Sequence, residues 1–464
     1  MVFSSLQFIF IFMPVFFICY YLVPARWKNA LLLAGSFCFY FAGTISNPEY
    51  LILFIITIWV DYMTGLGIEH LSEKKRIFLL AGIAFHLISL TSFKYLGFIF
   101  KEISRYTQSA KMMNQVVLPI GISFYTFQGI SYIVDVYRGK TKAEKSLLCF
   151  AVYMAMFEQL IAGPIVTFEQ VRKKLYKRKI DLTMVQKGAG TFVLGLGLKV
   201  LLANPIGKLW TQVCAIGFES VSTPLAWMAI FAFTFQIYFD FWGYSLMAIG
   251  LGKMLGFWLP TNFNYPYLSL TMTEFWRRWH MTLGAWFREY VYIPLGGSKD
   301  GWLHTVRNLA IVWMLTGIWH GAGYNFILWG AVLFVILLIE KLWLGKIMNR
   351  IPMIGHLYML VMIPLTWTIF AIDQMDQLWV FFTRLFPFGA QGVWSVFRYD
   401  YVKYWKQYYP FFLIAILFST RIPFRILKKI KKNWIVWVLL GAIFGASVYC
   451  MGRGLDDPFL YFRF

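Results

Sequence analysis

Long apolar runs, separated by short polar or basic segments, dominate the chain. Several of them are shorter than the roughly 20 residues that a straight membrane span needs, so we expect tilted, re-entrant or protein-buried helices among them. Together they predict an all-α polytopic membrane protein with about eleven transmembrane helices. The runs lie at about residues 2–22, 29–43, 50–66, 78–100, 115–134, 147–166, 188–203, 225–239, 241–258, 309–319, 325–339, 357–372, 410–420 and 434–450.

Composition and charge support a place in the lipid bilayer. Charged residues make up 14% of the chain, against about 25% in a soluble protein, which excludes an ordinary cytosolic enzyme and a disordered chain. The net charge is +22. Its basic residues fall in short clusters between apolar runs, as in cytoplasmic loops, so we expect a membrane partner and no nucleic acid. The strongest clusters lie at 73–76, 172–179 and 428–432.

The cysteines and histidines show no metal-binding pattern. The five cysteines lie in or beside apolar runs and form no C-x-x-C pair, so they are interpreted as small packing residues. The two most unusual histidines, His280 and His320, are 40 positions apart, which is not a local zinc-ligand spacing. We therefore expect no metal site.

Residues 262–303 differ from their surroundings because they combine aromatic and charged side chains. Read as one helix, this segment has an apolar face and an opposite face that carries arginines, so it is expected to be interfacial or re-entrant. A mere interfacial anchor with arginines that snorkel to water remains open. The apolar face carries Trp276, Trp279, Leu283, Phe287 and Tyr290, and the other face Arg277, Arg278 and Arg288.

His280 lies on the apolar side of that segment, and His320 ends a later apolar run. A histidine within a membrane is costly and is a functional candidate by default, since a neutral imidazole can act as a general base. The glycines at 317, 321 and 323 predict room for a substrate beside His320. A buried structural role stays open for both histidines. The other four, His70, His86, His304 and His356, are assigned structural roles.

Several further polar residues lie in or beside apolar runs. Asp240, for example, lies between two of them, where an acid commonly belongs to a site or pathway. An ion pair or a hydrogen bond between helices is equally open. The candidate substrate-binding residues are Arg277, Arg278, Asp240, Asn262, Asn308 and Trp319.

Five strings resemble the membrane-bound O-acyltransferase superfamily, and most of all its bacterial branch typified by alginate O-acetyltransferases. The resemblance is strongest over 235–330 and extends to about residue 345, beyond which only the hydrophobic character matches. The strings are LPIGISFYTFQGISYIVDVYRG (118–139), QLIAGPIV (159–166), FQIYFDFWGYSLMAIGLGKMLGFWLPTNFNYPY (235–267), TEFWRRWHMTLGAWFREYVYIPLGG (273–297) and NLAIVWMLTGIWHGAGYNFILWG (308–330).

This resemblance implies a ring of transmembrane helices around a thinned, funnel-shaped centre. It implies one integral-membrane domain over 1–464, with 262–303 as a motif segment inside it, in the cytoplasmic membrane of a bacterium. His320 corresponds to the invariant family histidine and His280 to the second one, so both are expected to be catalytic. The implied reaction moves an acyl group, expected to be acetyl, from a cytoplasmic thioester toward an envelope or exported polysaccharide. An SGNH-hydrolase-like extracytoplasmic partner is expected to complete it.

Two positions depart from the family pattern. Many relatives have Phe-Pro-Gln before the LIAGPI string, where this chain has Glu158 as the middle residue. That carboxylate is expected either to alter acceptor handling or to face water. Relatives often carry a His-Gly pair after the last Trp-Gly, where this chain has Ala331 and Val332. Neither departure affects His280 or His320.

The expected mechanism is direct transfer. His320 takes the proton of the acceptor hydroxyl, and His280, or an amide or indole donor near it, stabilises the oxyanion or orients the substrate. Arg277 and Arg278 hold phosphates of the donor, expected to be acetyl-CoA, and no permanently bound cofactor is expected. No cysteine or serine stands in a nucleophile motif, which disfavours an acyl-enzyme. The alternatives are D-alanyl transfer to teichoic acids, or a flippase for lipid-linked sugar, which would also use broken helices.

Overall fold

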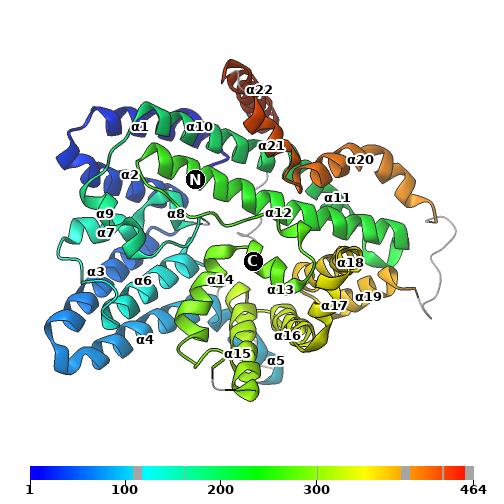
Figure 1. Ribbon diagram of the computed structural model, residues 1–464, viewed down its shortest axis with the longest axis horizontal. Helices are drawn as coiled ribbons and strands as arrows, with labels where there is room; N and C mark the ends of the chain where they lie inside the picture. Colours follow the sequence, from blue (N-terminus) through cyan, green and yellow to red (C-terminus); the bar gives the residue numbers. More distant parts are fainter. Residues whose placement is uncertain (108–117, 162, 300, 388–397, 431–432, 455–464) are drawn as a thin grey trace. The chain divides into compact units, whose positions relative to one another are not determined.

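The computed structural model describes residues 1–107, 118–161, 163–299, 301–387, 398–430 and 433–454 (Figure 1). Within these ranges the regular secondary structure is helical, and no strand occurs. The all-α prediction is therefore confirmed for this part of the chain.

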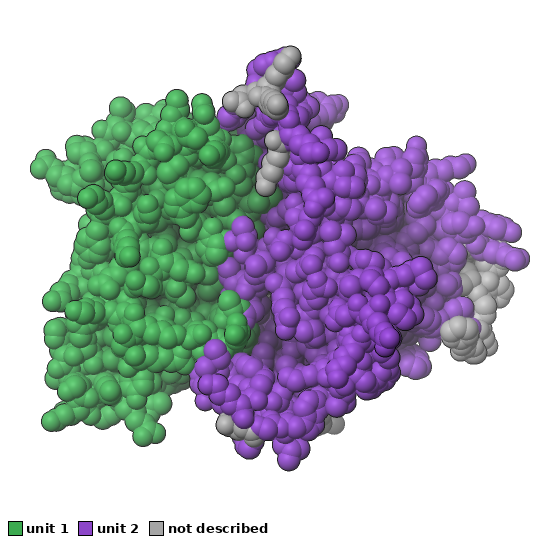
Figure 2. Space-filling view, viewed as in Figure 1, with its two compact units in different colours: residues 1–192, 245–260, 285–290 green, residues 193–244, 261–284, 291–464 purple. Residues whose placement is uncertain are grey.

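Two compact units divide the chain, and Figure 2 shows the residues of each in its own colour. Unit 1 comprises residues 1–192, 245–260 and 285–290, and unit 2 comprises 193–244, 261–284 and 291–464. Four helices have residues in both units: α10 (Leu182–Gly197), α12 (Thr223–Met254), α14 (Met281–Phe287) and the π-helical η7 (Arg288–Tyr292). The expectation of a single domain over 1–464 stays a prediction.

Unit 1 consists mainly of helices from the first part of the chain. Its α3, α4 and α6 contact one another in pairs and form a three-helix cluster (Figure 1). Its helices are η1 (Phe8–Phe12), α1 (Met13–Leu22), η2 (Ala25–Trp27), α2 (Lys28–Gly43), α3 (Glu49–His70), η3 (Ser72–Lys74), α4 (Lys75–Lys94), α5 (Leu96–Thr107), α6 (Ile122–Tyr137), α7 (Leu147–Ala155), α8 (Phe157–Leu160) and α9 (Phe168–Tyr176).

Unit 2 contains the aromatic motif segment and the helices that follow it. The pair α15 and α16 makes its most extensive helix–helix contact. Its helices are η4 (Leu198–Ala203), α11 (Asn204–Ile216), η5 (Phe218–Ser220), η6 (Pro266–Leu268), α13 (Met272–Arg278), α15 (Trp302–His320), α16 (Tyr324–Ile339), η8 (Glu340–Leu344), α17 (Gly345–Arg350), α18 (Pro352–Ala371), α19 (Met375–Leu385), α20 (Asp400–Phe418), α21 (Ile422–Lys429) and α22 (Asn433–Gly452).

Seven helical stretches in the described chain are long and apolar enough to cross a membrane. This confirms a polytopic membrane protein, while the count of eleven and the ring around a thinned centre stay predictions. Shorter helices such as α7 and α8 agree with the expected short segments. The seven are Glu49–His70, Ser72–Lys94, Leu182–Ile216, Thr223–Met254, Tyr324–Arg350, Pro352–Ala371 and Trp434–Gly452.

Helix α12 corrects one sequence expectation. The apolar runs 225–239 and 241–258 were separated by Asp240, but the structure has one 32-residue helix through both. Within this helix the Asp240 carboxylate accepts from Lys199 of the π-helical η4 at 2.5 Å. Both side chains are almost fully buried. The ion-pair alternative therefore describes Asp240, and removing either partner would leave a buried charge uncompensated.

Candidate active site

The aromatic motif segment is broken at His280. We predicted one helix through Trp276 and Phe287, and this is wrong, because α13 ends at Arg278 and α14 begins at Met281. At the break, backbone groups pair with those of the extended chain before α13. Asn264 donates its N–H to the Arg278 carbonyl at 2.9 Å, and Met281 donates to the Asn262 carbonyl at 2.9 Å. His280 itself has φ 42°, a left-handed conformation that is costly outside glycine and gathers at functional sites.

The start of α13 is held by side-chain acceptors. Thr271 caps the helix by accepting from the N–H of Glu274 at 3.1 Å. The buried carboxylate of Glu340, in η8, accepts from the N–H groups of Met272 and Thr273 at 2.6 and 2.8 Å. A carboxylate at a helix N-terminus satisfies free donors and complements the helix dipole. Both ends of α13 are therefore fixed, and with them the backbone that leads into His280.

Asn262 orients the His280 ring. The Oδ1 atom of Asn262 accepts from the N–H and hydroxyl of Thr282 at 3.3 and 2.7 Å, which identifies that atom as the oxygen. His280 Nδ1 lies 3.3 Å from the same oxygen, so Nδ1 carries the proton. Nε2 is then an acceptor, and it has no hydrogen-bond partner among the described residues.

His280 is 2% exposed, and this burial lowers its pKa from 6.5 to about 3. The imidazole is therefore neutral at physiological pH. A neutral ring with its proton on Nδ1 presents only a lone pair at Nε2. It can accept a hydrogen bond from a substrate hydroxyl, but it cannot donate one to an oxyanion from that atom.

The Trp319 ring lies near the rings of both His280 and His320. The centroid of the Trp319 ring is 6.4 Å from that of His280 and 4.8 Å from that of His320. Trp329 and Phe370 approach the His320 ring edge to face, each with centroids 5.1 Å away. His320 is the last residue of α15 and is partly exposed, unlike His280. The structure thus brings four predicted residues into one aromatic cluster: Asn262, His280, Trp319 and His320.

The glycines near His320 do not provide room for a substrate, and that prediction was wrong. A Cβ on Gly317 would lie 2.4 Å from the Phe326 carbonyl oxygen, and one on Gly321 would lie 2.1 Å from the Phe326 ring. Both positions therefore serve close packing between α15 and α16. Small residues have this role in many membrane helix pairs.

The remaining candidates have other contacts. The amide of Asn308 donates to the carbonyl groups of Leu295 and Gly297 at 3.0 and 2.9 Å, which ties the start of α15 to the preceding loop. Arg278 is paired with Glu274 at 2.5 Å, four residues earlier on α13. Arg277 is exposed. Asp240 is held by Lys199, as described above.

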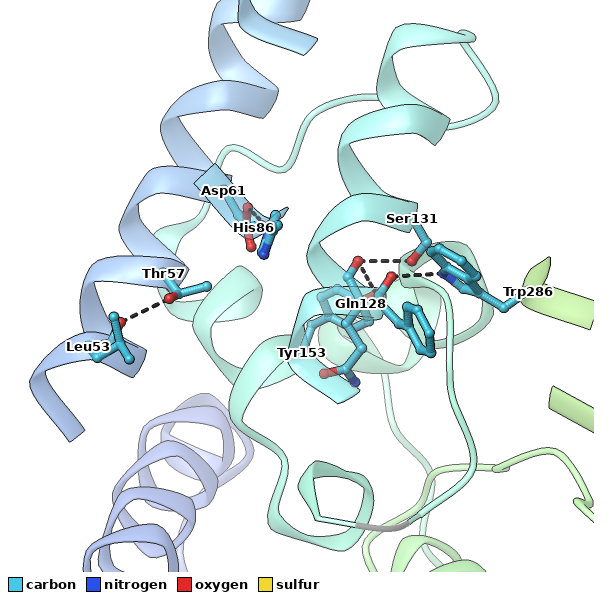
Figure 3. Close-up of polar contacts among 9 residues, drawn as sticks. Leu53, Thr57, Asp61, His86, Gln128, Ser131, Tyr153 and Trp286 are labelled. Atoms are coloured by element: carbon cyan, nitrogen blue, oxygen red, sulfur yellow. Dashed lines mark hydrogen bonds and ion pairs between the residues drawn. The ribbon is translucent and has the colours of Figure 1, made fainter. Parts of the chain in front are cut away.

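Sequence analysis missed a buried acid–imidazole pair in unit 1. His86 Nε2 lies 2.7 Å from Asp61 Oδ1, and the two residues are 1% and 0% exposed. Figure 3 shows their side chains meeting next to α6. A Cβ on Gly129 of that helix would lie 2.3 Å from the same Nε2, so backbone closes the pair from that side. The signal in the sequence was an acid and a histidine in two neighbouring apolar runs.

Glu158, the departure in the LIAGPI motif, is 0% exposed, so the expectation that it faces water is wrong. Neither carboxylate oxygen has a hydrogen-bond partner among the residues that the structure describes. Within the same residues, no group of three or more His, Cys, Asp or Glu side chains could hold a metal ion.

Comparison with known proteins shows the family to which the chain belongs. The model of the membrane-bound O-acyltransferase family matches residues 143–372, which include both histidines. The protein named probable alginate O-acetylase AlgI of Azotobacter vinelandii is 38% identical over 397 residues, 84% of this chain and 79% of its own. The protein of the same name from Pseudomonas putida is 35% identical over 494 residues, all of both chains. The peptidoglycan O-acetyltransferase of Helicobacter pylori is 34% identical over 367 residues, 71% and 68% of the two chains.

The chain therefore belongs to the membrane-bound O-acyltransferase family and is an O-acyltransferase. The resemblance also extends further than the sequence analysis expected. The Pseudomonas putida alignment includes the residues after 345, which had matched only in hydrophobic character.

Proposed function

We propose that this protein moves an acetyl group from a cytoplasmic thioester, acetyl-CoA, toward an exported or cell-envelope polysaccharide. The observation that carries the proposal is the cluster in which His280 and His320 flank Trp319. The names of the relatives, two alginate O-acetylases and a peptidoglycan O-acetyltransferase, favour acetyl over D-alanyl. The proposed location is the cytoplasmic membrane of a bacterium.

In the proposed reaction, His320 accepts the proton of an acceptor hydroxyl. The resulting alkoxide attacks the thioester carbonyl, the carbon–sulfur bond breaks, and the thiolate leaves and takes up the proton. General-base assistance of this kind usually contributes 10²–10⁴-fold. The partial exposure of His320 supports this role, because a substrate hydroxyl has to reach the ring.

His280 is proposed to orient the acceptor. Its Nε2 accepts a hydrogen bond from a second hydroxyl of the acceptor, so that the reacting hydroxyl keeps its single proton for His320. Asn262 holds the ring in the tautomer that leaves Nε2 free to accept. This replaces the expected oxyanion role, for which Nε2 lacks a proton. A pKa of about 3 also makes His280 a weak base, so proton removal falls to His320.

Arg277 and Arg278 are proposed to hold donor phosphates, and an SGNH-hydrolase-like protein on the outer face is proposed to pass the acetyl group to the polymer. Arg278 directly precedes the break that carries His280. Its position supports a donor that binds next to the reacting groups. A flippase would move a lipid-linked sugar without consuming a thioester, so the two proposals differ in a measurable product.

The test is reconstitution into liposomes with acetyl-labelled acetyl-CoA inside and polysaccharide outside, with and without the purified partner. Acetyl ester on the polymer only when the partner is present supports the relay. Ester without the partner overturns the relay but keeps the transferase. Label that stays in acetyl-CoA, together with transport of lipid-linked sugar, overturns the proposed function. D-alanyl transfer is distinguished by supplying D-alanyl thioester in place of acetyl-CoA.

A further inference from the structure

Three arginines line one cavity in unit 2. The cavity has a volume of about 410 Å³ and is lined by Leu268, Arg278, Thr420, Arg421, Ile422 and Arg425. Arg278 ends α13. Arg421 directly precedes α21 and Arg425 lies in the middle of α21, more than 140 residues later. The fold therefore brings guanidinium groups from two distant segments around the same space.

Tyr265 joins the two segments. Arg278 lies 3.5 Å from the Tyr265 carbonyl oxygen, and the Arg421 guanidinium lies 5.7 Å from the centre of the Tyr265 ring. Tyr265 has φ 48°, the left-handed conformation that is uncommon outside glycine. A non-glycine residue held in this conformation is a strained element that the surrounding structure has to stabilise.

The charge of the cavity is unbalanced. Glu274 pairs with Arg278 and offsets one of the three guanidinium charges. Arg421 and Arg425 are exposed, and no ion pair of either is found among the described residues. Like charges around one space repel each other, and an anion in that space would remove this cost. Arg421 is the N-cap of α21 and Arg425 lies in the first half of that helix, where the helix dipole also favours an anion.

The chemistry of the lining residues indicates the kind of anion. Guanidinium groups present planar pairs of N–H donors that match the oxygens of a phosphate, and they bind it more specifically than ammonium groups do. The Thr420 hydroxyl is already used, since it donates to the Leu417 carbonyl and accepts from the Ile422 N–H. Arg421 and Arg425 are thus the groups most available to a ligand, while Arg278 also donates to Glu274 and to the Tyr265 carbonyl.

We propose that Arg278, Arg421 and Arg425 form a binding site for a phosphoryl group. Two sources share this chemistry: the diphosphate of a nucleotide-bearing acyl thioester and the headgroup of an anionic membrane lipid. The first source rests on the proposed function. If the ligand is the acyl thioester, Arg278 anchors the donor two residues from His280. Helix α13 then connects the donor-binding site to the cluster of His280, Trp319 and His320.

The test is made on the full chain in nanodiscs of phosphatidylcholine, with inorganic pyrophosphate and acyl-free coenzyme A as probes. Coenzyme A without an acyl group binds but is not turned over. The expected result is saturable binding that the double variant Arg421→Ala/Arg425→Ala weakens at least about tenfold, as for lost charge-assisted hydrogen bonds. Arg350→Ala removes an exposed arginine at the end of α17 and is expected to change nothing.

A second arm distinguishes the lipid. The same variants are purified from membranes containing phosphatidylglycerol, and the lipid retained is measured by native mass spectrometry. Loss of phosphatidylglycerol with unchanged binding of both probes assigns the site to the lipid headgroup. Loss of probe binding assigns it to the donor. If neither ligand is affected, the proposal is overturned.

A lysine variant tests whether the planar guanidinium groups, and not only their charge, are needed for binding. Arg421→Lys/Arg425→Lys keeps the charges and removes the planar donors, so it reports on the site even if the alanine variant is poorly folded. The lysine variant is expected to bind pyrophosphate more weakly than the wild type. Wild-type affinity would show that only net charge matters, and it would overturn the proposed guanidinium site. Probe binding needs no turnover, so it can succeed where the liposome assay fails, and the two proposals fail independently.

Discussion

His86 in unit 1 and His280 in unit 2 are equally buried, at 1% and 2% exposed, but their surroundings differ. His86 contacts the carboxylate of Asp61 at 2.7 Å, and the Gly129 backbone closes the pair. His280 contacts the neutral amide of Asn262. Its Nε2 has no hydrogen-bond partner among the described residues, so the lone pair on that atom is unused. Burial alone therefore does not separate a structural histidine from a functional one. The separation comes from whether the partners leave a ring nitrogen for a substrate.

The largest effect is expected at His320, the proposed general base. His320→Ala should lower acyl transfer by at least about 100-fold, because the general base is lost, while the protein still inserts and purifies normally. The rate of ester formation in the liposome assay measures this. His70→Ala, at the exposed end of α3, is the matched control. Retention of more than about a tenth of the activity would remove His320 from the mechanism.

The second largest loss of activity is expected for substitutions at His280. His280→Asn tolerates the left-handed backbone at φ 42° but removes the imidazole, and we expect a loss of about 10–100-fold, smaller than or comparable to that of His320→Ala. Asn262→Ala keeps the ring and releases its tautomer, so we expect about a tenfold loss, mainly in kcat. Steady-state kinetics with varied acceptor separate the two. An Asn262→Ala enzyme with wild-type kcat would mean that the tautomer is not important.

A variant of the His86–Asp61 pair should change the stability of the protein and not its catalytic rate. Asp61→Asn removes the charged partner of His86, and we expect a loss of about 1–3 kcal/mol in the free energy of unfolding. The specific activity of the folded protein should stay within about twofold. Thermal unfolding followed by intrinsic fluorescence, together with activity per folded molecule, measures both. If catalysis falls as strongly as in His280→Asn, the contrast between the two histidines is wrong.

The smallest expected effect is a pH dependence. The pKa of His280 is about 3 in the folded protein and about 6.5 when unfolded, so between these values the unfolded chain binds a proton that the folded chain does not. Stability from this group is complete above pH 6.5 and is lost as the pH falls toward 3. The melting temperature of the wild type should therefore fall more steeply from pH 7 to 5 than that of His280→Asn. Parallel curves would show that His280 is not held neutral.

The sequence was sufficient for features that depend on neighbours along the chain. The runs 50–66 and 434–450 correspond closely to α3 and α22, because an apolar stretch of that length already defines a helix. His280 and His320 were both candidates because a histidine in an apolar segment is costly. Their joint catalytic role came from the family resemblance, since their spacing alone gave no reason to group them.

Other features depend on residues far away in sequence and could not be predicted. Asp240, inside helix α12, is paired with Lys199, which lies 41 positions earlier in the sequence. The break at His280 requires backbone donors and acceptors of Asn262 and Asn264, which the 3.6-residue period does not show. The space beside Gly317 is filled by α16, and a sequence gives no sign of which partner occupies such a space.

The carboxylate of Glu340 limits how far the motif segment can be exchanged. It accepts four hydrogen bonds, three from Met272 and Thr273 and one from the Tyr358 hydroxyl. The segment 262–303 is therefore not a portable module, although its sequence motif looks like one. A chimera that transplants it into another acyltransferase has to supply an acid at the position of Glu340, or α13 begins with unsatisfied donors and His280 loses its fixed backbone.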